Sequence, residues 1–94
     1  MTPDQIKLAR HALGLPNKQR KAYRNRFVAH ADSPDGHLWS EMVHAGFAVC
    51  TPDDIRPDGW KVFRLTIAGA FTALEDSETI PVSSLASKHD GDTT

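Results

Sequence analysis

The stretch WKVFRLTIAGAFTAL (60–74) decides the fold class because its hydrophobic period changes halfway along. Residues 60–66 are rich in β-forming side chains, with Phe63 and Leu65 expected to face the core and Arg64 the solvent, so they are predicted to form a strand. From residue 67 onward, apolar residues follow the i, i+3, i+4, i+7 spacing of an amphipathic helix, which Thr66 is placed to cap. The apolar stripe of that predicted helix consists of Ile67, Ala70, Phe71 and Leu74.

The residues just before this stretch contain a second β-prone segment and a loop. FAVC (47–50) is short and apolar, whereas TPDDIRPDG (51–59) contains two prolines and ends in an Asp-Gly step, which is typical of turns. Residues 47–50 and 60–66 are therefore predicted to pair as a hairpin connected by the loop 51–59. Cys50 is the single cysteine of the chain, so no intrachain disulfide is possible, and we expect it to be a buried thiol in the hairpin.

Two helices with clear capping signals are predicted upstream of the hairpin. The first spans residues 3–13, because Thr2 and Gln5 match a capping box and Gly14 supplies a stop. The other spans residues 34–45, where Ser33 is the expected N-cap and a glycine at position 46 ends the helix.

The segment KQRKAYRNRFV (18–28) is predicted to form a further helix between these two. Asn17 is positioned to cap it, and Tyr23 and Phe27, four residues apart, supply its apolar contact. The predicted order is therefore helix, helix, helix, strand, loop, strand, helix.

This order resembles that of a winged helix-turn-helix domain, in which the hairpin loop is the wing. Residues 34–75 carry the likeness most specifically, since Gly46-Phe47 at a helix exit and Leu65-Thr66-Ile67-Ala68-Gly69 after the hairpin resemble MarR- and PadR-type regulators. The resemblance implies a mainly α fold with a small β-hairpin, in the order α-α-α-β-wing-β-α. Residues 1–76 would then form one winged-helix-like domain. The polar, acidic residues 77–94 are expected to be a flexible, largely disordered tail.

The chain as a whole also resembles small uncharacterised proteins of phages and prophages. The matching stretches are residues 2–15, 23–28 and 65–70. This resemblance implies a phage accessory protein and brings no known activity with it.

Length and composition predict one small domain with a single core, since 94 residues with 39% hydrophobic content suffice for no more. No apolar run approaches the roughly 18 residues of a membrane span, and no apolar signal segment is present, so we expect a cytoplasmic protein without membrane contact. Few residues remain for a dimerisation helix, which favours a monomer or a weak homodimer.

The net charge of −1 conceals a strong asymmetry along the chain. Residues 1–31 contain seven Lys or Arg against one acid, whereas the remaining residues contain four against eleven. Most of the positive charge lies on the predicted helix 18–28, and a clustered basic surface is a candidate site for nucleic acid, although a solvated helix face is the alternative interpretation. The residues expected to contact nucleic acid are Lys18, Arg20, Lys21, Arg24, Arg26 and Lys61.

Two features argue against the usual way in which winged-helix regulators bind DNA. The predicted helix 34–45 contains no Lys or Arg to contact bases. The loop 51–59 contains three aspartates against one arginine, so its net negative charge would repel the phosphate backbone. The common use of the scaffold still makes nucleic-acid binding, as in a transcriptional regulator, the leading hypothesis. The alternative is a protein partner reached through charge complementarity, for example a host complex inhibited by an anti-CRISPR-type phage factor.

The sequence contains no pattern typical of catalysis, cofactor binding or a metal site. His30, His37 and His44 recur every seven residues, but two helical turns separate the last two by about 10 Å along a helix axis, too far for one ion. No glycine run is suited to phosphate binding, and although Ser40 and His44 would share a helix face, nothing supplies an oxyanion hole or a pocket for catalysis. We therefore expect a binding module that is not an enzyme, with no catalytic residues, cofactor or metal.

Overall fold

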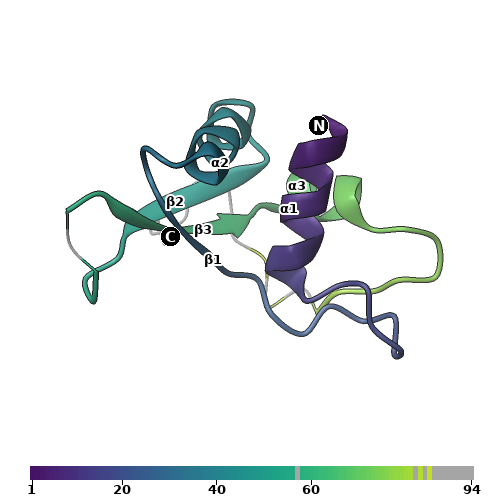
Figure 1. Cartoon of the computed structure of the whole chain (residues 1–94). Helices are drawn as coiled ribbons and strands as arrows, with labels where there is room; N and C mark the ends of the chain where they lie inside the picture. The colour runs from purple at the N-terminus through teal and green to yellow at the C-terminus, as the bar shows by residue number, and fades with distance from the viewer. Residues whose placement is uncertain (57, 82, 84, 86–94) are drawn as a thin grey trace, which may run out of the picture.

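The computed structural model of the chain describes residues 1–56, 58–81, 83 and 85, and within them three helices and three strands follow the order α-β-α-β-β-α (Figure 1). These elements are α1 (Pro3–Leu13), β1 (Phe27–His30), α2 (Pro34–His44), β2 (Ala48–Pro52), β3 (Trp60–Leu65) and α3 (Ile67–Ala73). The fold is α+β, with 37% helix and 22% strand. The prediction of a mainly α, winged helix-turn-helix-like fold is wrong, because the predicted second helix does not form and β1, which begins at Phe27, adds a third strand to the sheet.

The predicted helix 18–28 does not form because side-chain and backbone geometry hold its first half in a turn. Asn17, expected to cap the helix, closes this turn instead: its Nδ2 donates to the carbonyl oxygens of Gly14 and Lys21, at 3.1 and 2.8 Å. Arg20 has a φ of 54°, in the left-handed region that an α-helix excludes. The turn therefore directs the chain back toward α1.

Asn25 explains why the chain then becomes a strand. Its buried side chain donates from Nδ2 to the Leu65 carbonyl at 3.0 Å and accepts from the Leu65 N–H at 2.8 Å. The side-chain amide takes the positions that the backbone of a neighbouring strand would occupy opposite Leu65. Pairing continues through the backbone two residues later, where Phe27 lies opposite Phe63.

The sheet is antiparallel with β3 at its centre, in the order β1-β3-β2. The predicted hairpin is confirmed as the pairing of β2 with β3, in which Cys50 lies opposite Phe63. The Cys50 side chain is exposed, whereas Ala48 on the same edge strand is buried, so the prediction of a buried thiol is wrong.

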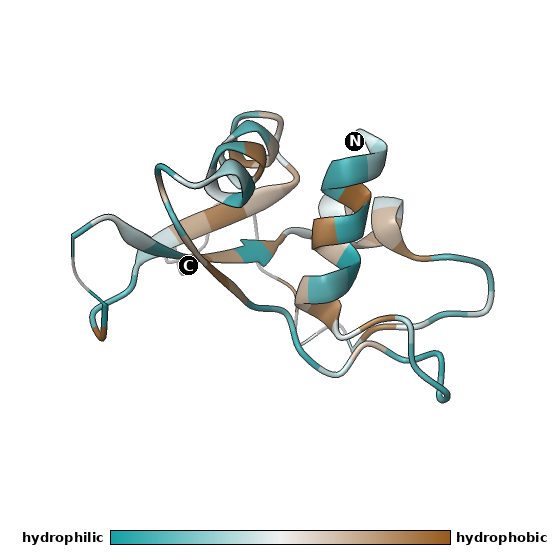
Figure 2. Ribbon diagram, viewed as in Figure 1, coloured by the Kyte–Doolittle hydropathy of each residue, from teal (hydrophilic) through white to brown (hydrophobic). Residues whose placement is uncertain are grey.

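The core lies between the sheet and α2, while α1 packs beside them against α3 (Figure 1). Trp39 of α2 is fully buried, and its ring centroid lies 5.4 Å from that of Phe63 and 5.6 Å from that of Phe27. Apolar residues follow the sheet and the inward-facing sides of the helices (Figure 2). Burying side chains of this size contributes about 1.5–3 kcal/mol each.

The predicted caps of the three helices that form are confirmed. Thr2, Ser33 and Thr66 each accept a hydrogen bond from a backbone N–H in the first turn of the helix that follows. Gly14, with a φ of 79°, ends α1 in the left-handed conformation that favours glycine.

The apolar stripe predicted for the last helix is only partly buried. Ala70 is inaccessible, but Ile67 and Phe71 are 54% and 59% exposed. The cause is close packing at Gly69, where a Cβ would overlap with the carbonyl oxygen of Phe47. The helix presents its small residues to the sheet, so its large ones point outward.

No helix in the described part of the chain is long and apolar enough to cross a membrane. Of the segment predicted as a flexible tail, 77–94, the first residues lie against the domain: Glu78 is buried and Thr79 forms a β-bridge with Lys21. Residues 86–94 lie outside the described residues.

Candidate nucleic-acid interface

The C-terminal half of α1 and the segment 14–24 that turns back beneath it form an open groove of about 450 Å³. We call it the basic groove, because three of its lining residues carry a permanent positive charge and none is acidic. It is lined by Lys7, Arg10, His11, Gly14, Leu15, Pro16, Tyr23 and Arg24.

Arg24 is held at this groove by the end of α1. Its Nη2 donates to the His11 carbonyl at 2.7 Å, and its Cζ lies 5.4 Å from the centroid of the Tyr23 ring. The last carbonyls of a helix lack hydrogen-bond partners within the helix. A cation there is favourable for two reasons, because it donates to such a carbonyl and because its charge interacts favourably with the negative end of the helix dipole. Arg24 is exposed, so its other guanidinium N–H groups remain accessible to a ligand.

Tyr23 places an aromatic ring on the rim of the basic groove. Its backbone N–H donates to the Leu13 carbonyl at 3.2 Å, which fixes the segment against α1, while its side chain is 66% exposed. The ring packs on Gly14, where a Cβ would overlap with it. The glycine that ends α1 thus also makes room for the ring.

Arg10 contributes less charge to the groove than its position suggests. Its guanidinium donates to both carboxylate oxygens of Glu78, at 2.6 and 2.8 Å, and Nη1 also donates to the Ala73 carbonyl at 3.0 Å. The hydrogen bond from Arg10 outweighs the desolvation of Glu78 and lowers the pKa of that carboxyl to about 2. The cations left for a ligand are therefore Lys7 and Arg24.

The structure places Lys18, Arg20 and Lys21 in the turn at the far end of the segment, outside the basic groove. The Arg20 side chain is engaged there, since Nε donates to the Ser77 hydroxyl at 2.6 Å and Nη2 to the Asp76 carbonyl at 2.7 Å. Of the six residues predicted to contact nucleic acid, only Arg24 is among the residues that line the basic groove.

Arg26 and Lys61 lie apart from each other. Arg26 is exposed, and its N–H donates to the Ala12 carbonyl at 3.1 Å, just before β1 begins. Lys61 lies in β3 opposite Ala29 and Pro52, next to the β2–β3 loop, and it is not among the residues that line the basic groove.

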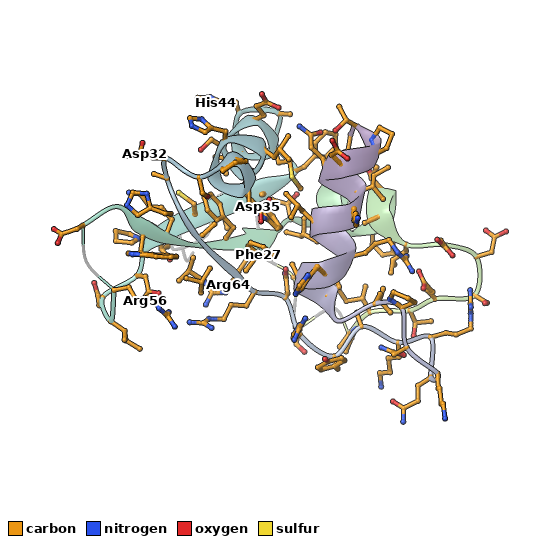
Figure 3. The ribbon with its side chains drawn as sticks, viewed as in Figure 1. Phe27, Asp32, Asp35, His44, Arg56 and Arg64 are labelled. Carbon is orange, nitrogen blue, oxygen red and sulfur yellow. The ribbon has the colours of Figure 1, made fainter. Side chains whose placement is uncertain are left out.

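A second group of basic residues lies on the side of the sheet away from α2, where Figure 3 shows Arg56 and Arg64. The Arg56 Cζ lies 6.0 Å from the centroid of the Trp60 ring, and its Nη1 is 3.0 Å from Oδ2 of Asp53. Burial tends to raise the pKa of Asp53, but hydrogen bonds from the backbone of Ile55 and from Arg56 outweigh it, so the pKa is lowered. The Asp53 carboxylate thus compensates the charge of Arg56, which makes this surface a weaker anion site than the basic groove.

Sequence reasoning missed Lys7, Arg10, His11 and Tyr23 as residues of a possible site. Lys7 and His11 are four residues apart on a correctly predicted helix, so the sequence does indicate that they share a face. It does not indicate that residues 14–24 turn back beside that face, because this depends on the Asn17 turn and on contacts with distant residues.

The chain matches no known protein-family model, no curated protein and no solved structure.

Proposed function

We propose that this protein is a non-enzymatic module that binds nucleic acid through the basic groove. Lys7 and Arg24 contact phosphate, and an unpaired base stacks on the Tyr23 ring. The observation that carries the proposal is the combination of uncompensated cations with an exposed aromatic ring, in a groove without an acidic lining residue.

This combination favours single-stranded nucleic acid over duplex. Proteins that bind single strands pair a positively charged groove with aromatic rings on which bases stack, and each stacked base contributes about 1–3 kcal/mol. In duplex DNA the bases are already stacked, so Tyr23 would offer them little.

Fluorescence anisotropy with a labelled single-stranded oligonucleotide tests this proposal. We expect Lys7→Glu combined with Arg24→Glu to abolish binding at low salt, and Lys18→Glu combined with Lys21→Glu to weaken it only slightly. The second variant carries the same charge change outside the groove, so equal losses in both would contradict the assignment. A duplex of the same sequence should bind more weakly than the single strand.

Protein binding is a second candidate function, favoured by the exposure of Ile67 and Phe71. These side chains are four residues apart on α3 and so share one helix face, which is the arrangement of anchors in helix-mediated recognition. A partner recovered in stoichiometric amount by the wild-type chain and lost with Phe71→Ser, while nucleic-acid affinity is unchanged, would support this candidate.

A further inference from the structure

We propose that two copies of this chain pair through the outer edges of their β2 strands, joining two three-stranded sheets into one continuous antiparallel sheet. The inference goes beyond the nucleic-acid proposal and uses a different surface, so either can fail without the other.

The hydrogen bonds that flank β2 fix which of its backbone groups face β3. The Thr66 N–H donates to the Phe47 carbonyl, and the Asp53 N–H donates to the Trp60 carbonyl, each at 3.0 Å. In an antiparallel ladder the residues that bond to one neighbour alternate with those that point away from it. The odd-numbered residues of β2 therefore bond to β3.

The even-numbered residues point outward. Ala48 and Cys50 each direct one N–H and one carbonyl away from the sheet, and Pro52, which has no N–H, ends the row. Such a row is a template for another strand, and edge strands usually carry charged residues that prevent this pairing. β2 carries none.

The two ends of the opposite edge of the sheet are already engaged within the chain. The Arg26 N–H, at the start of β1, donates to the Ala12 carbonyl at 3.1 Å. The His30 carbonyl, at its end, accepts from the N–H of Ser33 at 3.0 Å and from its hydroxyl at 2.7 Å. Across residues 1–56 and 58–81, β2 thus offers the longer open row, because Ala48 and Cys50 both point an N–H and a carbonyl outward whereas β1 has only Val28 between its engaged ends.

An open groove of about 460 Å³ runs along the outer edge of β2 beside the end of α2. Its lining has no Lys, Arg, Asp or Glu, so a charged segment would lose hydration there without gaining an ion pair. A short, neutral strand with small side chains suits this groove, and the AVCTP segment of β2 is such a strand. The groove residues are Val43, His44, Ala45, Gly46, Ala48, Val49, Cys50 and Thr51.

A second copy meets the edge with two-fold symmetry. In this arrangement Val49 lies opposite Val49 of the second copy, and Ala48 of each copy lies opposite Cys50 of the other. The outward N–H of each of these residues then meets the outward carbonyl of the residue opposite it. The contact closes on itself, so it yields a dimer and not a filament.

Sedimentation velocity over a concentration series up to about 1 mM tests the proposal, since few hydrogen bonds give a weak dimer. Cys50→Pro removes the outward N–H without removing a bond to β3, and Cys50→Ala is its matched control. We expect the wild type and Cys50→Ala to dimerise alike, and the Kd of Cys50→Pro to rise by about tenfold or more, because symmetry deletes two hydrogen bonds. Circular dichroism reports whether Cys50→Pro folds, and Thr51→Lys, which places like charges at the contact, replaces it if not.

A chain that stays monomeric up to about 1 mM would overturn the proposal, as would a dimer that Cys50→Pro and Thr51→Lys leave unchanged. A monomer whose Ala48 and Cys50 amide NMR signals shift on addition of a neutral synthetic peptide would also overturn it and assign the edge to a strand from a different chain.

Discussion

The Arg10 guanidinium clamps the Glu78 carboxylate end-on, with Nη1–Oε1 and Nη2–Oε2 distances of 2.6 and 2.8 Å. The pair joins α1 to the segment that follows α3, and both side chains are largely buried, 12% and 2% exposed. It therefore has two effects: it fastens the last described segment to the domain, and it withdraws one positive charge from the basic groove.

Glu78→Gln is expected to lower the free energy of unfolding by about 2–4 kcal/mol, because it leaves the Arg10 charge largely buried without its partner. Chemical denaturation measures this difference. Glu75→Gln is the matched control, since Glu75 lies 3.8 Å from Arg10 but is 66% exposed, and it should cost less than about 1 kcal/mol. Equal losses in the two variants would show that the Glu78 clamp adds no more than surface charge.

Stability should depend on pH through the same carboxylate. Because the pKa of Glu78 is lowered from 4.5 to about 2, its contribution is fully present above pH 4.5 and is lost as the pH falls toward 2. Denaturation midpoints of the wild type should thus decline over this range more steeply than those of Glu78→Gln. Parallel curves for the two proteins would contradict the assigned pKa.

The clamp also predicts a change in binding. If Glu78→Gln remains folded, the Arg10 guanidinium becomes available to phosphate, and affinity for a single-stranded oligonucleotide should increase severalfold at low salt. Anisotropy titrations measure the change, and Glu75→Gln again serves as control. An unchanged affinity, with the fold intact, would place Arg10 outside the binding surface.

Asn25→Ala should destabilise the protein by about 1–3 kcal/mol, because it leaves the N–H and carbonyl of Leu65 without the side chain that pairs with them. Thermal unfolding measures the loss, with Gln19→Ala at an exposed loop position as control. Hydrogen exchange of the Leu65 amide should accelerate in the same variant, and an unchanged rate would contradict the role given to Asn25.

The elements bounded by local signals were predictable from the sequence. Thr2, Ser33 and Thr66 start helices through hydrogen bonds to residues three positions away, and glycines 14 and 46 follow the ends of two of them, so a local pattern suffices. The β2–β3 hairpin followed in the same way from two β-prone segments separated by a loop that contains two prolines and an Asp-Gly step.

The segment 14–30 was not predictable, because its conformation depends on residues far along the chain. Asn17 is a residue type that often caps helices, but here its side chain closes a turn. Asn25 forms hydrogen bonds with Leu65, forty positions away. Basic and aromatic residues at helix-like spacing favoured a helix there. Tertiary hydrogen bonds outweighed that preference, and so the basic groove, which requires the segment to turn back on α1, could not be foreseen either.

Tyr23 provides a test of base stacking that leaves the charge unchanged. Tyr23→Ala should weaken single-strand binding by about 1–3 kcal/mol, and Tyr23→Phe should retain it, because stacking needs the ring and not the hydroxyl. Anisotropy at a fixed salt concentration measures both. Equal losses in the two variants would assign the effect to the hydroxyl and contradict stacking.

The salt dependence of single-strand binding tests the central claim most directly. Lys7→Gln with Arg24→Gln removes two charges while keeping an amide able to donate to the His11 carbonyl, and Lys18→Gln with Lys21→Gln removes two outside the groove. If Lys7 and Arg24 contact phosphate, the first variant should reduce the slope of log K against log salt by about 1.4, and the second should leave it unchanged. Equal slopes in the wild type and the groove variant, or no binding by the wild type at low salt, would contradict the account.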